Sequence, residues 1–163
     1  MDLLDRILGH DYWATNLLLE TCASLRESQL TQEFDVGNKT ILDTLTHQIH
    51  VLNYWRQGMA GEQTTKDWPK RQSITELIEV HNRYQPTFAE VARAAQVAGR
   101  LDETFSDFYG YPQSIGATIL QTMYHNTWHR SEVRHMLQRL GVQDLWDGDP
   151  QEREYVLRNQ NPS

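Results

Sequence analysis

The segment from His125 to His135 reads HNTWHRSEVRH and contains two histidines four residues apart, followed by a carboxylate. At about 100° per residue on a helix, His125 and His129 lie one turn apart on one face, and Glu132 continues that face. Two imidazoles at this spacing can bind one divalent ion, each nitrogen at about 2.0–2.2 Å. The pattern indicates half of a metal site, or only polar residues on a helix surface.

A third ligand would have to come from another part of the chain, because catalytic metal sites usually have three protein ligands and one open position. His47 and His50 both lie in TLTHQIHVLNYW, which has an apolar stripe of its own. A histidine in such a stripe needs a partner for its ring nitrogens, and a metal, a backbone carbonyl or a buried water would each serve. His10, His81 and His135 have no partner at a suitable spacing, and we expect them at the surface or at helix caps.

Four long runs with a helical period would position these residues. TILD at Thr40 predicts a cap with Asp43 returning the bond, and SITE at Ser73 predicts a capping box with Glu76. Pro86 predicts a kink or a split in its helix, and Gly141 predicts the end of the last one. The four expected helices cover residues 2–25, 40–59, 73–98 and 114–140.

The connections are expected to be polar loops, with a short extended segment within residues 101–113. Trp146 and Tyr155 predict that the C-terminal tail packs back on the body for part of its length. Four amphipathic helices in a chain of this size predict an all-α, four-helix bundle with a short C-terminal extension, folded as one domain over residues 1–163.

Composition narrows the function classes. The formal net charge of −7 argues against a nucleic-acid-binding face, which is usually basic. No stretch reaches the roughly 18 apolar residues of a membrane span, and the start of the chain does not resemble a secretion signal. Cys22 is the single cysteine and lies in an apolar helical pattern, so we expect a packing residue in a cytoplasmic protein.

These motifs resemble those of the DinB/YfiT-like metalloenzyme superfamily. The pattern on the family's second helix is matched by Thr44-Leu45-Thr46-His47, with Trp55 eight residues after the histidine. The last helix carries His125, three residues, His129, and then Arg-Ser-Glu where the family has Arg-Gly-Gln. The resemblance spans nearly the whole chain, and its specificity rests on the three histidines and their flanks.

The resemblance implies a bundle of up-down-down-up type that often forms a homodimer. It also implies a metal site made by His47, His125 and His129, with water or substrate completing the shell. Family members are described with zinc, nickel, iron or manganese, so the resemblance does not choose the metal, and imidazole ligands suit several of these ions.

Two departures from the family pattern concern the site directly. Glu132 replaces a glutamine and could be a fourth ligand, a partner of a ligand histidine, a general base, or an ion-pair partner of Arg130 or Arg134. We favour a role as partner of a ligand histidine or as an ion-pair partner over direct ligation, and retain Glu132 as the candidate catalytic residue. Trp128 stands where many relatives have a further histidine, and its indole could pack on a neighbouring helix or line the mouth of the site.

Characterised relatives include transferases and isomerases that use bacillithiol, mycothiol or glutathione, and hydrolase activity is ascribed to some. The resemblance therefore implies a metal-dependent enzyme that transfers a small thiol to an electrophile in detoxification or stress response. Trp68, Tyr109 and Tyr111 could wall its pocket, or could simply anchor their loops. The alternatives are a metal-dependent hydrolase with Glu132 as base, and a non-catalytic metal-binding module.

Overall fold

The structure is a computed structural model that describes residues 1–160. Its long helices are α1 (Leu3–Ala23), α3 (Ile41–Met59), α4 (Ile74–Val97) and α5 (Ile115–Arg139). Shorter elements are α2 (Glu27–Leu30), α6 (Pro150–Gln160) and the strands β1 (Thr104–Ser106) and β2 (Pro112–Ser114). None of the described helices is long and apolar enough to cross a membrane.

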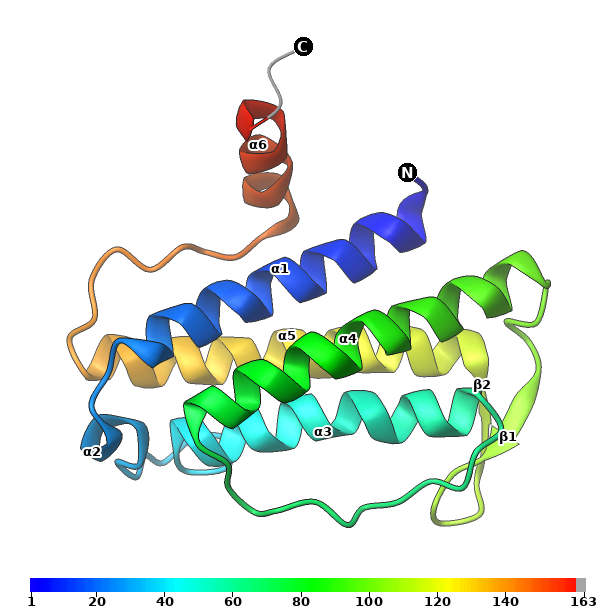
Figure 1. The fold of residues 1–163 in the computed structure, drawn as a ribbon, viewed down its shortest axis with the longest axis horizontal. Helices are drawn as coiled ribbons and strands as arrows, with labels where there is room; N and C mark the ends of the chain where they lie inside the picture. The colour runs from blue at the N-terminus through cyan, green and yellow to red at the C-terminus, as the bar shows by residue number, and fades with distance from the viewer. Residues whose placement is uncertain (161–163) are drawn as a thin grey trace.

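The four long helices form the expected bundle. In Figure 1, α1 and α5 run in one direction and α3 and α4 in the other, which is the up-down-down-up arrangement. Each of α1 and α3 packs against both α4 and α5. The segment 60–73 returns along the length of the bundle so that α4 can run parallel to α3 (Figure 1).

The helix ends follow the predicted caps with one exception. Ser73 and Glu76 form a capping box, and α5 ends before Gly141, whose φ of +81° suits a residue without a side chain. The Thr40 hydroxyl accepts from the amide of Asp43 as predicted, but the Asp43 carboxylate does not return the bond. It pairs with the guanidinium of Arg71 at 2.6 Å, because that charged donor is a stronger partner than an amide.

Of the two outcomes predicted at Pro86, a kink or a split, the split does not occur. The helix α4 continues through the proline as one element. Proline removes the amide that would donate to the carbonyl of Asn82. In the same turn the Thr87 hydroxyl donates to the carbonyls of Arg83 at 3.1 Å and Tyr84 at 2.9 Å.

The core consists of two apolar clusters separated by polar side chains. Leu45, Ile49 and Val133 belong to one cluster, and Leu52, Phe88 and Ile119 belong to the other. Between them lie buried polar residues, which we call the central polar layer: Asp11, Thr15, Gln48, Asn126 and Arg130. The histidines of the candidate site are at the same level of the bundle, since His47, His125 and His129 directly neighbour Gln48, Asn126 and Arg130 in the sequence.

The remaining segments agree with expectation. Strands β1 and β2 form an antiparallel hairpin within the segment where an extended stretch was expected. The C-terminal extension runs back beside α1 to α6, which also contacts α1 (Figure 1). Cys22 is fully buried in the first apolar cluster, and burial raises the pKa of its thiol to about 12, as expected for a packing residue.

Candidate metal centre

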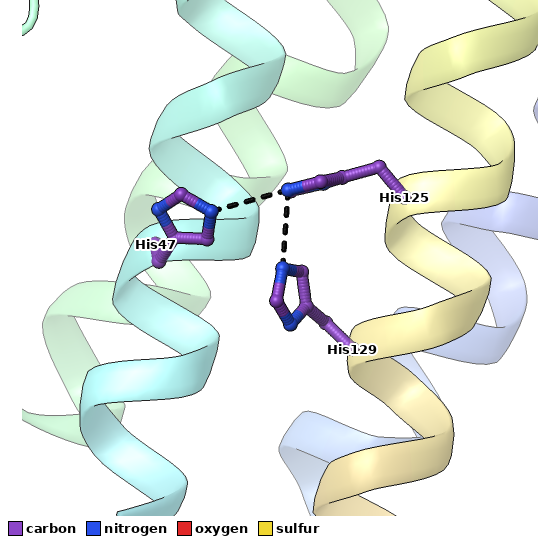
Figure 2. A group of neighbouring side chains, drawn as sticks. All are labelled: His47, His125 and His129. Atoms are coloured by element: carbon purple, nitrogen blue, oxygen red, sulfur yellow. Dashed lines mark hydrogen bonds between the residues drawn. The ribbon is translucent and has the colours of Figure 1, made fainter. Parts of the chain in front are cut away.

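Helices α3 and α5 bring the three predicted ligands together. His47 projects from the middle of α3, and His125 and His129 project from successive turns of α5 toward it (Figure 2). The Nε2 atom of His125 is 3.1 Å from the Nε2 of His47 and 3.1 Å from the Nε2 of His129. One ligand atom from each of the three histidines lies within 4.8 Å of the others. His50, the other histidine in the same stretch of α3, is not part of the group.

The spacing fits a shared ion. Two nitrogens that each lie 2.1 Å from one metal are separated by about 3.0 Å at a right angle and about 3.4 Å at the tetrahedral angle. The observed 3.1 Å separations lie between these values. All three side chains are only partly buried. The three histidines could therefore hold a metal ion.

The rings are held in the form that metal binding requires. Burial lowers the pKa of His125 to about 4, and the neighbouring imidazoles act in the same direction. Burial also lowers the pKa of His47, with a smaller contribution from His129. A neutral imidazole keeps a lone pair on one nitrogen, whereas the protonated ring has none. At neutral pH these two rings are thus able to act as ligands.

Glu132 determines which nitrogen of His129 faces the group. Its Oε2 is 2.7 Å from the Nδ1 of His129, and both side chains are 14% exposed. A carboxylate can only accept, so Nδ1 carries the proton and the lone pair is on Nε2, toward His47 and His125. The other oxygen, Oε1, accepts from the Nε1 of Trp128 at 2.8 Å. Both oxygens of Glu132 are engaged, which favours a positioning role.

The ion pair with Arg130 or Arg134, one of the alternatives for Glu132, is not formed. Arg130 turns to the other side of α5 and pairs with Asp11, and Arg134 pairs with Asp147. Trp128 remains 70% exposed and does not pack on a neighbouring helix. Its indole lies beside the carboxylate that orients His129.

The other histidines have separate environments. His50 is buried, contacts the Oε1 of Gln72 at 2.6 Å and stacks on Trp68. His135 is exposed as expected, and His10 contacts the carbonyl of Gly148 at 2.7 Å. The expectation that His81 lies at the surface or at a helix cap is wrong, because it is buried within α4. Its side chain is fully buried, and its Nδ1 is 2.9 Å from the Oδ1 of Asn16 on α1. Asn16 is 65 residues away in the sequence, so the residues around His81 could not predict this contact.

The aromatic loop residues mainly anchor their loops. Trp68 packs against His50 and Tyr54, and Tyr111 is exposed. Tyr109 accepts a hydrogen bond from the ammonium of Lys66 at 2.9 Å, which joins the segment 60–73 to the β-hairpin. The charge of Lys66 contributes to the lowered pKa of His47, so this pair of loops lies near the site.

Gly37 is a site residue that sequence reasoning missed. Its φ is +59°, and a side chain there would begin 2.8 Å from the Oε2 of Glu132 and 3.1 Å from the hydroxyl of Thr44. The loop before α3 therefore closes over Glu132 at a position that suits glycine. The only available signal was the glycine in DVGNK, which reads equally well as an ordinary turn.

Comparison with known proteins shows the fold and the family of this chain. The crystal structure of a DinB-like protein from Bacillus cereus ATCC 10987 superposes with a TM-score of 0.65 at 19% identity. The match covers 86% of this chain and 95% of that one, and at this identity it shows the fold. No protein of curated function matches the sequence at a significant level. The model of the DinB family matches residues 2–155, and the chain therefore belongs to the DinB family.

Proposed function

We propose that this protein is a metal-dependent enzyme that transfers a low-molecular-weight thiol to an electrophilic small molecule. The observation that carries the proposal is the convergence of imidazole nitrogens from three partly buried histidines, with two of the nitrogen–nitrogen distances at 3.1 Å. When bound there, a divalent ion would stabilise a thiolate at neutral pH or polarise an electrophile. Zinc, iron, nickel and manganese remain candidates, since imidazole ligands do not discriminate strongly among them.

The chain's own residues would prepare this chemistry. His47 and His125 offer neutral rings because burial lowers the pKa of each. Glu132 holds the proton of His129 on Nδ1 and so directs the Nε2 lone pair into the group. In the transfer itself, a carbon–sulfur bond forms as the bond to the leaving group breaks. With a haloaromatic electrophile the halide leaves with the bonding electrons, and the thiol proton passes to solvent.

Hydrolysis of an amide or ester is the second candidate. It would need a general base beside the ion, and Glu132 is the nearest carboxylate to the histidines in the sequence. However, both of its oxygens already accept hydrogen bonds, from His129 and from Trp128. This arrangement supports a positioning role for Glu132 more than the role of a base, and we therefore rank the transferase above the hydrolase.

Metal content and thiol dependence test the proposal together. After anaerobic purification, elemental analysis should find about one equivalent of a divalent metal, and His47→Ala should lose it. His135→Ala is the matched control, because that exposed histidine on α5, the helix of His125 and His129, should be dispensable. The loaded protein should then conjugate bacillithiol, mycothiol or glutathione to a haloaromatic electrophile.

The outcomes separate the candidate functions. Turnover that does not need the thiol would reject the transferase in favour of the hydrolase. A protein that carries no stoichiometric metal and binds none on titration would leave only a non-catalytic helical module. The homodimer expected from the family resemblance stays a prediction, and sedimentation velocity would check it.

A further inference from the structure

A groove on the opposite side of α5 from Glu132 has the features of a second binding site. It is a cavity of about 840 Å³ between α1, α5 and α6. This volume is within the range of about 300–1,000 Å³ that is usual for small-molecule sites. None of the three metal-site histidines lines it, and we call it the α6 groove.

The walls of the α6 groove are apolar over much of their area. Ile7 and Met123 lie in the wall, and four large side chains beside them remain well exposed. Leu3 is 72% exposed on α1, Leu120 and Tyr124 are 53% and 73% exposed on α5, and Tyr155 is 67% exposed on α6. A cluster of exposed large apolar side chains from three elements indicates a surface that binds something.

The charge of the groove is opposite to that of the protein. Four arginines line it against two carboxylates, although the whole chain has a net charge of −7. Arg130 pairs with Asp11, and Arg6 pairs with Glu154. Within residues 1–160, Arg153 and Arg158 have no carboxylate within ion-pairing distance. The groove therefore offers two guanidinium groups to an anion.

Gly9 creates the place that Arg153 occupies. A methyl group at Gly9 would lie 2.4 Å from the Nη2 and 2.9 Å from the Cζ of Arg153, so the guanidinium rests directly on the backbone of α1. Glycine inside a helix costs about 0.5–1 kcal/mol relative to alanine. Here its lack of a side chain lets the cation of α6 lie beside the apolar wall of the groove.

We propose that the α6 groove binds a small amphipathic anion, with an acidic head at Arg153 and Arg158 and an aliphatic or aromatic body along Ile7, Leu120 and Tyr124. The two guanidinium groups would bind the acidic group of the ligand, because they match the charge and geometry of a carboxylate, sulfonate or phosphate. The apolar wall would bind the aliphatic or aromatic part of the ligand. The site is separate from the metal centre and does not need it.

Two naphthalene probes that differ in charge test the proposal. Anilinonaphthalene sulfonate should bind saturably at one site per chain and be displaced by laurate but not by inorganic phosphate. The double variant Arg153→Gln/Arg158→Gln should bind it about tenfold or more weakly, which corresponds to the loss of one charged hydrogen bond. Uncharged phenylnaphthylamine should be indifferent to these substitutions.

Gly9→Ala is the sharper variant. It should keep or raise the stability of the fold, since the atoms that must move are the end of one flexible side chain. It should nevertheless weaken the binding of the sulfonate probe severalfold because Arg153 is displaced. Arg100→Gln, at an exposed pair with Glu103, is the matched control and should leave binding unchanged. His47→Ala should also leave it unchanged.

Several results would overturn the proposal. Equal affinity in the double arginine variant would remove the anion site, and displacement by inorganic phosphate alone would make the apolar wall irrelevant. If the groove instead binds a second copy of the chain, sedimentation velocity should show a dimer, and the double arginine variant should be a monomer. Saturable probe binding would then be absent. Unfolding curves like that of the wild type would establish that a variant that loses probe binding is still folded.

Discussion

The contact between Glu132 and His129 fixes one imidazole tautomer, so the role of Glu132 in the candidate metal site can be measured. Glu132→Ala removes the acceptor 2.7 Å from Nδ1 and should weaken metal binding about 10- to 100-fold. Glu132→Gln retains an amide oxygen that can accept, so its loss should be smaller. Competition with a chromophoric chelator measures both affinities.

The matched control for this prediction is Glu90→Ala, an exposed carboxylate on α4. Equal metal affinity in wild type and Glu132→Ala would contradict the positioning role. In that case the tautomer of His129 would have to be set without the carboxylate.

Gly37 allows a second test at the residue scale. Gly37→Ala forces a side chain into a backbone with φ of +59° and places its methyl 2.8 Å from the Oε2 of Glu132. The strain should cost about 1–3 kcal/mol of unfolding free energy, and the displaced carboxylate should also lower metal affinity. Gly61→Ala has a similar φ of +73° with nothing within 4 Å, so it should lose stability alone. Urea unfolding of both variants measures the loss of stability, and metal titration measures the loss of metal affinity. An equal loss of metal affinity in Gly37→Ala and Gly61→Ala would contradict a role for the contact between Gly37 and Glu132.

At the scale of the helices, the buried pair of Asp11 and Arg130 joins α1 to α5 within the central polar layer. Asn126 donates to the second oxygen of Asp11 at 2.8 Å, and Thr15 accepts from both Arg130 and Gln48. Asp11→Ala would leave a buried guanidinium without its counter-charge and should cost about 3–5 kcal/mol in urea unfolding. The double variant Asp11→Leu/Arg130→Met should recover much of this loss. If Asp11→Ala alone has nearly the stability of the wild type, water must reach the guanidinium of Arg130 in the central polar layer.

The helices and their caps could be predicted because their signals are local. The apolar period, the Ser73–Glu76 box and the end at Gly141 all lie within a few residues of the elements they define. The three histidines could be grouped because spacing and the family pattern agreed on them. His81 and Asp43 could not be interpreted correctly, because the partners that decide their environments are Asn16 on α1 and Arg71 in the segment 60–73. Partner choice depends on packing, and one sequence does not encode it locally.

For the whole molecule, buried histidines should make the fold sensitive to acid. Burial lowers the pKa of His81 to about 4, whereas an unfolded histidine titrates near 6.5. The unfolded chain therefore binds the proton first, so stability is full above about pH 6.5 and falls as the pH drops toward 4. The contribution of His81 between pH 7.5 and pH 5 is about 2 kcal/mol.

Urea unfolding at these two pH values measures that contribution by difference. His81→Gln should lose less stability on acidification than the wild type, by about the same 2 kcal/mol. His135→Gln, at an exposed position, should keep the wild-type dependence. An unchanged pH dependence in His81→Gln would mean that the ring is already charged in the folded protein.

The two apolar clusters also predict how the whole fold responds to metal removal. Neither cluster includes His47, His125 or His129, so the bundle should fold without an ion. A metal at 100 times its dissociation constant adds about 2.7 kcal/mol by mass action, which for a chain of this size raises the melting temperature by about 5–10 °C. Chelation should reverse that shift and leave the far-ultraviolet helix signal intact. Collapse of the helix signal on chelation would instead make the ion part of the folding free energy, as in structural zinc sites, and would place the triad among structural rather than catalytic centres.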